Sequence, residues 1–525
     1  MGHSMIAKIP FPLSLRAFIG VTLLLLCFSW YQELIRFPFN HDNGAILEIS
    51  RRVLDGEVLY KEFPEPNPPL IILFANVVSS VSSMFGFDKM LTWRLFFLLL
   101  STCVVAFAAY ILLKSDVDFS KARDQGFLWL LIALIFPYSG YDFSQREHLA
   151  AVFLIPFLLL SSARVQEKSI PFISAVAAGI LAGIGVSFKP FFLLVFFFIQ
   201  LYLFDARQNA HRTWIFPESI SLFLTAGGFL VWVVCGTWYL QGIVFLQPFY
   251  TAYNLPLYWI CFNFNLFPFY LAVILHTIFE PPAHEKSLRQ VLFIGAAAFT
   301  ISFIIQAKGF NYHSLPSRIF SLSLLYLILS SFGDTSPTNK KEIREAAKYI
   351  GSYCFLAPVF FIALVSVSTF IQPWEAELGN ETAEFISQIQ DLGPGKRVHV
   401  LTTQCTPIFP AFNYCGLQTT QRNVSMIIAK LYGYQDTFDG PFSYEIGSNS
   451  QQAAQLFTNM TVEDIASRTP DYIFSDENPI RQGLGASRFN FIEFLSRDSR
   501  FKDIFEKSYR FFRKTPRYRI FKKIE

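Results

Sequence analysis

Residues 91–113 read LTWRLFFLLLSTCVVAFAAYILL, a stretch in which Arg94 is the only charged side chain. A helix of this length and composition can cross the hydrocarbon core of a bilayer, which takes about 20 apolar residues. The whole chain has the same character, since 53% of its 525 residues are hydrophobic and 16% are charged. The sequence therefore predicts a helical integral membrane protein.

Apolar runs of this kind recur along the chain, near residues 13–31, 70–86, 91–113, 127–138, 148–163, 170–187, 190–204, 216–237, 258–279, 290–307, 315–332 and 350–371. If all of them crossed the membrane, the basic segments 114–123 and 164–168 would lie outside, against the preference of Lys and Arg for the cytoplasmic side. The run 70–86 is the one to exclude, because it is short, rich in serine and bounded by Pro69 and Gly86. We expect about eleven transmembrane helices, and interfacial helices in a first outer loop at 34–90.

This topology places the N-terminus in the cytoplasm and makes every cytoplasmic loop basic, while the short outer loops keep Arg146, Lys189 and Lys308. The first run lacks a cleavage pattern of small residues behind it and is typical of an anchor. The chain then divides into a membrane body, 1–371, and a small soluble α/β domain outside the cytoplasm, 372–525. In that domain we expect strands at 397–401 and 471–475 and a helix at 462–467.

Two features of the soluble domain admit two interpretations each. The basic residues between Lys507 and Lys523 alternate with aromatics, which fits either a solvated helix or contact with anionic headgroups. Cys405 and Cys415 lie ten residues apart, and they form either a disulfide or two free thiols.

The first outer loop contains Asn40-His41-Asp42-Asn43-Gly44 before an apolar-periodic stretch at 45–54. Asp42 or Asn43 would cap that helix, and Pro68 and Pro69 would set the entry to the next one. A carboxylate at the outer membrane surface is also where a general base would deprotonate a hydroxyl that attacks a lipid-borne sugar. Asp42 is therefore the candidate base, and His41 beside it is a candidate for substrate binding.

The second outer loop, 138–148, places four ionisable groups between two apolar runs: Asp142, Arg146, Glu147 and His148. Asp142 or Glu147 could assist Asp42 or hold a cation, and Arg146 and His148 could bind substrate. The alternative interpretation is an N-cap for the next helix and an exposed pair of Arg146 with Glu147, which would contribute little.

Two further outer loops carry cations, at Phe188-Lys189-Pro190 and in the segment 306–318, whose candidate residues are Lys308, Tyr312, His313 and Arg318. These side chains offer charge-assisted donors suited to phosphate oxygens, and Gly309 allows a close approach of the backbone. The alternative is that Lys189 and Lys308 only snorkel at the ends of membrane helices.

These residues together resemble the GT-C membrane glycosyltransferases, in particular the aminoarabinose-transferase and protein-mannosyltransferase-like (family 39-type) group. The matching positions cover most of the membrane body: Asp42, Pro68-Pro69-Leu70, Phe85-Gly86, Arg94-Leu95, 145–148 and 308–316. The resemblance implies an inverting enzyme of the bacterial inner membrane, acting in envelope glycan or lipopolysaccharide biosynthesis, with Asp42 as general base. It would take a sugar from a polyprenyl-phosphate donor and pass it to a lipid, glycan or protein acceptor, with no role for nucleic acid.

A divalent metal is possible, but no Asp or Glu follows Asp42 directly and no motif supports one, so we assign no metal ligand and no certain cofactor. Two other functions compete: a transporter or flippase of lipid-linked saccharide, and a non-catalytic envelope assembly protein. Ion-coupled transport favours charges near mid-membrane. Here the charges lie at predicted outer ends of spans, at Arg94, Glu147, Lys189, Lys308 and Arg318, which favours chemistry at the surface.

Overall fold

The computed structural model describes residues 14–115, 122–208, 213–251, 254–331, 373–402, 404–422, 448–477 and 490–524. Contacts within the chain divide it into two compact units. Unit 1 comprises Met1–Phe37, Arg94–Leu230 and Leu255–Pro373, and unit 2 comprises Pro38–Trp93, Val231–Asn254 and Trp374–Glu525. The predicted division into 1–371 and 372–525 stays a prediction.

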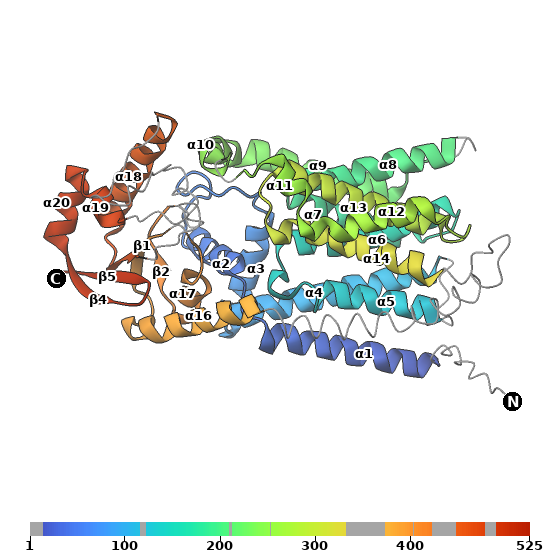
Figure 1. The fold of residues 1–525 in the computed structure, drawn as a ribbon, viewed down its shortest axis with the longest axis horizontal. Coiled ribbons are helices and arrows are strands. Elements are labelled where there is room, and N and C mark those ends of the chain that lie inside the picture. Colours follow the sequence, from blue (N-terminus) through green and yellow to red (C-terminus); the bar gives the residue numbers. More distant parts are fainter. Residues whose placement is uncertain are drawn as a thin grey trace. The chain divides into compact units, whose positions relative to one another are not determined.

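Unit 1 is a bundle of helices (Figure 1). In chain order its elements are α1 Leu15–Tyr31 with the π-helical η1 Gln32–Arg36, most of α4 Lys89–Leu113, α5 Ala122–Ile135, η2 Gly140–Asp142, α6 Arg146–Val165, α7 Phe172–Ser187, η3 Pro190–Phe192, α8 Leu193–Gln208, most of α9 Pro217–Gly236, α11 Leu257–Cys261, η4 Phe264–Leu266, α12 Phe267–Ile278, α13 Lys286–Gln306, η5 Asn311–Ser314 and α14 Leu315–Ser330.

Six described helical segments are long and apolar enough to cross a bilayer: Leu15–Arg36, Lys89–Leu113, Arg146–Val165, Pro190–Arg207, Pro217–Gly236 and Lys286–Gln306. Each coincides with an apolar run, which confirms the predicted class of polytopic helical membrane protein. Other runs form shorter helices, such as α7 and α14 with 16 residues each. The run 350–371 lies outside the described residues, so the number of about eleven spans stays a prediction.

The sequence suggested one continuous helix for the apolar run 258–279, but the structure shows three shorter elements. The run forms α11, the 3₁₀ turn η4 and α12. The side chain of Asn263 accepts a hydrogen bond from the amide of Asn265 at 2.9 Å, which competes with helical pairing of the backbone. Pro268 then stands in the first turn of α12, where it begins a helix well but could not continue one.

Helix α6 lies inside the bundle. In its most apolar stretch of 18 residues 89% is buried, against 22% in the corresponding stretch of Leu15–Arg36. Helix α6 packs against α7, α8, α13 and α14. Apolar side chains elsewhere in unit 1 are exposed, for example Phe223 and Leu224 on α9, each at 64%. A bilayer would cover such surface, which is why the bundle can leave it outside.

Two glycines of α7, Gly179 and Gly183, permit close contact with α9. A Cβ atom at Gly179 would lie 2.0 Å from Ser221 Oγ and 2.2 Å from the Glu218 carbonyl oxygen. A Cβ atom at Gly183 would lie 2.6 Å from Thr225 Cβ. Small residues four apart are a common means of close helix packing in membranes.

Replacement of Gly179 by valine should force α7 and α9 apart. We expect a loss of about 1–3 kcal/mol, as for other overpacked interiors, seen as a lower melting temperature in detergent. Gly228→Val is the matched control, because a Cβ atom at Gly228 on α9 meets nothing within 4 Å. Equal melting of the two variants would contradict the close contact.

Unit 2 combines helices of the first loop with the C-terminal part of the chain. Its elements are α2 His41–Leu54, α3 Leu70–Phe85, α10 Tyr239–Thr251, α16 Pro373–Ile389, η6 Gln390–Leu392, β1 Arg397–Leu401, α17 Ile408–Cys415, β2 Gln418–Thr419, α18 Ser448–Arg468, β3 Tyr472–Asp476, α19 Phe491–Leu495, α20 Ser499–Ser508, β4 Tyr509–Lys514 and β5 Tyr518–Lys523. Helix α3 begins at Leu70 after Pro69, as predicted. Its interfacial location stays a prediction.

The strands form one mixed sheet in the order β2-β1-β3-β5-β4. β1 runs parallel to β2 and β3, and β5 runs antiparallel to β3 and β4. The predicted strands at 397–401 and 471–475 and the helix at 462–467 are confirmed as β1, β3 and part of α18. The small α/β region expected at the C-terminus is therefore present.

The basic tail contains a β-hairpin, β4 and β5, after α20, so the interpretation of the whole tail as a solvated helix is wrong. In β5, Tyr518 and Ile520 are buried while Arg519 between them is half-buried. Phe521 after them is also buried, in an apolar cluster with Phe494 and Tyr509, so apolar side chains on both faces of this strand are covered. In the same unit Cys405 and Cys415 are free thiols.

The buried His399 on β1 should make the C-terminal region sensitive to acid. Burial, and to a lesser degree the charge of Arg468, lowers the pKa of His399 to about 3. The unfolded chain would bind a proton from roughly pH 6.5 downward, so the stability that neutral His399 allows is present above pH 6.5 and is lost as the pH falls toward 3.

At pH 5 this loss should amount to about 2 kcal/mol. We expect His399→Gln to remove most of the difference in melting between pH 7.5 and pH 5 that wild type shows, since glutamine can still bond Thr420 and does not titrate. An unchanged pH dependence in this variant would mean that His399 is not the responsible group.

Candidate active site

Lys189 is the centre of a buried polar cluster in unit 1. It lies just before η3, and its side chain is 7% exposed. Its ammonium donates to the Glu147 carboxylate, to Gln306 Oε1 at 2.9 Å and to His313 Nε2 at 3.1 Å. These partners belong to the first turn of α6, the end of α13 and η5. We call these four residues the Lys189 cluster.

The ammonium of Lys189 has three donors, and the cluster supplies three acceptors. Such saturation is what allows a charge to remain away from water, because an ion buried without partners is strongly disfavoured. The snorkelling interpretation of Lys189 is therefore wrong. The exposed pair of Arg146 with Glu147 is wrong as well, since Glu147 is fully buried and pairs with Lys189.

His313 is a neutral member of the cluster. Burial holds its pKa well below the usual range, and three neighbouring cations lower it further: Lys189, Arg146 and Lys308. Because Nε2 accepts from Lys189, the ring proton resides on Nδ1. His313 can therefore donate to a ligand, but as an uncharged group and not as the charge-assisted donor expected from the sequence.

Arg146 and Lys308 extend the positive field around His313. They are only 6% and 5% exposed, so neither one snorkels. Lys308 stands between two residues in the left-handed region, Ala307 and Gly309, at φ 55° and 67°. A Cβ atom at Gly309 would lie 2.6 Å from Leu255 Cδ1. The close approach of the Gly309 backbone to a phosphate stays a prediction.

Several buried polar groups near the cluster make no hydrogen bond within the described part of the chain: Glu147 Oε2, His313 Nδ1 and both amide atoms of Gln145. Buried polar atoms normally find a partner in protein, water or ligand. Together they offer an acceptor, a neutral donor and an amide at a site with a positive field. This chemistry suits an anionic group that also carries hydroxyls.

Tyr312 and Arg318 lie beside the cluster. The Tyr312 ring is 4.4 Å from the His313 ring between centroids, and Lys189 Nζ is 5.8 Å from its centre. Arg318 on α14 donates to Tyr138 Oη at 3.3 Å and to the Asn311 carbonyl at 3.3 Å. Arg318 thus fastens η5, which carries His313, to α14.

His148 and Asp142 differ from the cluster residues. His148 is fully buried, its Nε2 bonds the Ile135 carbonyl at 2.7 Å, and its Nδ1 accepts from the Ser144 amide at 3.2 Å. Both ring nitrogens are thereby engaged in holding the second outer loop. Asp142 is half-buried in η2, and its carbonyl accepts from the Gln145 amide at 3.2 Å. Substrate contact by either residue stays a prediction.

Asp42 belongs to unit 2, in the first turn of α2. The N-cap of this helix is Asn40, whose side chain accepts from the Asp42 amide at 2.8 Å. Asp42 and Asn43 are therefore not the cap, contrary to the capping interpretation. The reason is that α2 begins at His41, four residues before the apolar pattern at 45–54 suggested. Helix capping does not account for the Asp42 carboxylate.

The surroundings of Asp42 contain two further ionisable groups. His41 Nε2 lies 3.5 Å from Asp42 Oδ1, and both side chains are partly exposed. Burial, and then the charges of Asp42 and Glu65, raises the pKa of the Cys405 thiol. Glu65 is 6% exposed and accepts from the amide and the side chain of Asn67, at 3.2 Å and 2.5 Å.

Sequence reasoning did not single out Gln306 or Glu65, which lie beside the predicted site residues. Each is an uncharged or proline-flanked residue in a short loop or at a helix end, and its burial depends on distant segments. Among the described residues, no group of three or more His, Cys, Asp or Glu side chains is arranged to hold a metal ion.

Replacement of Glu147 by glutamine should leave the buried Lys189 charge uncompensated. We expect a loss of about 3–5 kcal/mol, the usual cost of breaking a buried ion pair. The melting temperature in detergent measures it. The double variant Glu147→Gln, Lys189→Met removes both charges and should lose less than the two single variants together; strict additivity would contradict the pairing.

Comparison with known proteins supports the fold. No family model matches the sequence, and no curated protein matches it. Among solved structures, ArnT from Cupriavidus metallidurans bound to undecaprenyl phosphate is 12% identical with a TM-score of 0.51, covering 97% of this chain and 98% of that chain.

Two further structures match less well. ArnT from Cupriavidus metallidurans in the apo state is 13% identical, with a TM-score of 0.48 over 96% of this chain and 97% of that one. The arabinosyltransferase EmbB from Mycobacterium smegmatis is 13% identical, with a TM-score of 0.41 over 70% of this chain and 42% of that one. The chain therefore has the fold of the aminoarabinose transferase ArnT, and the GT-C resemblance of its sequence is confirmed at the level of the fold.

Proposed function

We propose that this protein is a membrane glycosyltransferase that takes a sugar from a polyprenyl-phosphate donor and transfers it to an acceptor hydroxyl. The observation that carries the proposal is the group of buried cations in unit 1, Arg146, Lys189 and Lys308. All three lie near enough to the neutral His313 to lower its pKa. Such a site suits a phosphate that lies at the end of a lipid chain. ArnT, which has the same fold, was solved with undecaprenyl phosphate bound.

The chemistry needs two kinds of group. The bond between the anomeric carbon and the phosphate oxygen breaks, so the departing phosphate needs positive charge, which Lys308 and Arg146 would supply. The acceptor hydroxyl loses its proton as it attacks, and Asp42 would take that proton as general base. A single displacement of this kind inverts the anomeric configuration and needs no nucleophilic carboxylate.

The other predicted site residues have supporting roles in this proposal. Lys189 and Glu147 hold His313 in the tautomer that presents Nδ1–H, while Tyr312 and Arg318 hold η5. His41 would contact the substrate beside Asp42, and Asp142 would assist the base. Because Glu147, Gln306 and His313 accept the three hydrogen bonds of the Lys189 ammonium, Lys189 would orient the cluster more than donate directly to phosphate.

The proposal includes a location. The charge pattern favours a multi-pass protein of a bacterial inner membrane, with the N-terminus in the cytoplasm and both Asp42 and the C-terminal α/β domain outside. Donor, acceptor and bilayer are the partners, and the acceptor is a lipid, a glycan or a protein. The sites would then act on lipid-linked sugars that have already reached the outer leaflet.

The test uses the full chain in proteoliposomes with undecaprenyl-phosphate-linked pentoses and hexoses, supplied one at a time with extracted envelope acceptors. Cleavage of the donor is followed by thin-layer chromatography. Asp42→Asn should lower kcat by about 10²–10⁴-fold, the usual contribution of a general base, while binding of undecaprenyl phosphate is retained.

Lys308→Met should instead weaken binding of undecaprenyl phosphate by about tenfold or more, because a charge-assisted bond to phosphate is lost. Lys114→Met is the control: Lys114 lies after the end of α4, with its ammonium 5.8 Å from the Tyr110 ring centre. Full activity of Asp42→Asn would refute Asp42 as base. Movement of the intact lipid-linked saccharide between leaflets, without cleavage of the donor, would favour the flippase instead.

A further inference from the structure

We infer that the C-terminal region positions the helix that carries Asp42, and that it does so through one face of α2. This inference rests on the proposed role of Asp42 as general base. Gly44, Glu48 and Arg52 are spaced four residues apart, so they fall on one side of the helix. We call these three residues the docking face. Asp42 lies roughly 120° around the helix from Glu48, at 3.6 residues per turn, so the two functions occupy different sides.

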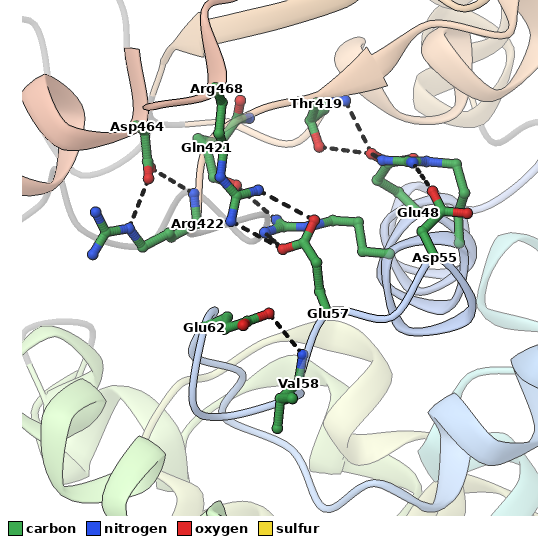
Figure 2. A network of polar contacts seen from close by, with 12 residues as sticks. Glu48, Asp55, Glu57, Val58, Glu62, Thr419, Gln421, Arg422, Asp464 and Arg468 are labelled. Atoms are coloured by element: carbon green, nitrogen blue, oxygen red, sulfur yellow. Dashed lines mark hydrogen bonds and ion pairs between the residues drawn. The ribbon is translucent and has the colours of Figure 1, made fainter. Parts of the chain in front are cut away.

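Glu48 makes the first contact of the docking face. Its side chain is 5% exposed, and its Oε1 accepts from the Thr419 amide at 2.9 Å and from Thr419 Oγ1 at 3.0 Å. Thr419 belongs to the edge strand β2, and Figure 2 shows both bonds reaching from α2 to that strand. Arg51 on the same helix neutralises the carboxylate at 2.8 Å.

Arg52 makes the second contact, and its side chain is completely buried. Its guanidinium donates to the Gln421 carbonyl at 2.9 Å and forms two bonds to Glu57, at 3.1 Å and 2.5 Å. Glu57 also accepts from Arg468, at the end of α18, at 2.9 Å (Figure 2). Arg52 further lies over the Phe63 ring at 4.3 Å. Because the planar Arg52 guanidinium is bonded on several sides, α2 cannot shift without breaking several of these bonds at once.

Gly44 makes the third contact, at the end of α2 near Asp42. Its carbonyl accepts from Asn413 Nδ2 at 3.1 Å. A Cβ atom at this position would lie 2.7 Å from Asn413 Oδ1, 3.1 Å from Phe409 Cβ and 3.4 Å from Pro410 Cα. The Asn413 side chain could turn away, but Phe409 would have to move. Helix α17 therefore approaches α2 so closely that a larger residue at position 44 would displace Phe409 by a few tenths of an ångström.

The three contacts fix both the rotation and the height of α2 within unit 2. Along the rest of the helix, Ser50 bonds Ser79 of α3 at 3.0 Å. A helix moves as a rigid rod over this length, so a shift at Gly44 is carried to Asp42 half a turn away. Misplacement of a catalytic group by about 1 Å can cost 10²-fold in rate. Gly44, Glu48 and Arg52 are therefore positioning residues, and none of them needs to touch the substrate.

The decisive variant is Gly44→Ala, because alanine has a higher helix propensity than glycine and cannot unwind α2. We expect kcat for donor cleavage to fall about tenfold or more, while KM for the donor and binding of undecaprenyl phosphate stay at the wild-type values. Arg52→Lys should act in the same direction, since an ammonium cannot replace the fork. Leu54→Ala is the control, because Leu54 lies on the same helix and is 51% exposed.

Hydrogen exchange by mass spectrometry supplies a readout that needs no substrate. In detergent, Gly44→Ala and Arg52→Lys should speed exchange of the amides in 41–50, while Leu54→Ala should not. The same peptide in Asp42→Asn should exchange as in wild type, because Asn40 remains the cap.

The outcomes separate the two proposals. If Asp42→Asn keeps full activity, the assignment of the base fails, whatever the docking face does. If Asp42→Asn is inactive but Gly44→Ala and Arg52→Lys keep wild-type kcat and wild-type exchange, the positioning inference fails alone. A loss of donor binding in these variants, with kcat unchanged, would also overturn it, because it would assign the docking face to substrate affinity.

Discussion

The salt bridge between Lys189 and Glu147 is the interaction on which the candidate site of unit 1 depends. A charge in a membrane bundle is tolerated only when its hydrogen bonds are satisfied, and Lys189 meets this condition with three partners from three other segments. The same arrangement dictates the state of His313. Since Nε2 must accept from an ammonium and the surroundings are positive, the ring stays neutral and carries its proton on Nδ1. One ion pair thus joins four segments and prepares a donor.

In unit 2, polar contacts hold the short helix α2, which carries Asp42 in its first turn. Helix α2 has 14 residues, and isolated helices of that length are marginal in water. Polar residues of α2 accordingly bond to other segments. Glu48 accepts a hydrogen bond from Thr419 of β2, and Arg52 donates to the Gln421 carbonyl and to Glu57. Two kinds of polar residue therefore stand on one helix: those that bind the C-terminal region, and Asp42, which lies beside His41 and is the proposed base. In the positioning inference, the C-terminal α/β region holds this helix in place.

The proposed reaction needs positive charge for the leaving phosphate and a base for the acceptor hydroxyl. The Lys189 cluster and its neighbours offer fixed positive charge and a neutral donor, and Asp42 offers a partly exposed carboxylate. Fixed charges stabilise a developing anion without reorganisation, and a base is effective when its geometry is held. Buried polar contacts fix the residues around Lys189 and the helix that carries Asp42.

The sequence by itself determined the membrane class, the sites of most helices, the strands at 397–401 and 471–475, and the loops that carry ionisable residues. These properties are local, because apolar length and periodicity act within one segment. The tertiary structure alone decided which polar groups meet. Lys189 bonds Glu147, Gln306 and His313, which are separated from it by 42, 117 and 124 positions along the chain. It also decided that Asn40 caps α2, that the basic tail folds as a hairpin and that His313 is neutral. Burial and partner distance control pKa and pairing, and both arise only when distant segments pack together.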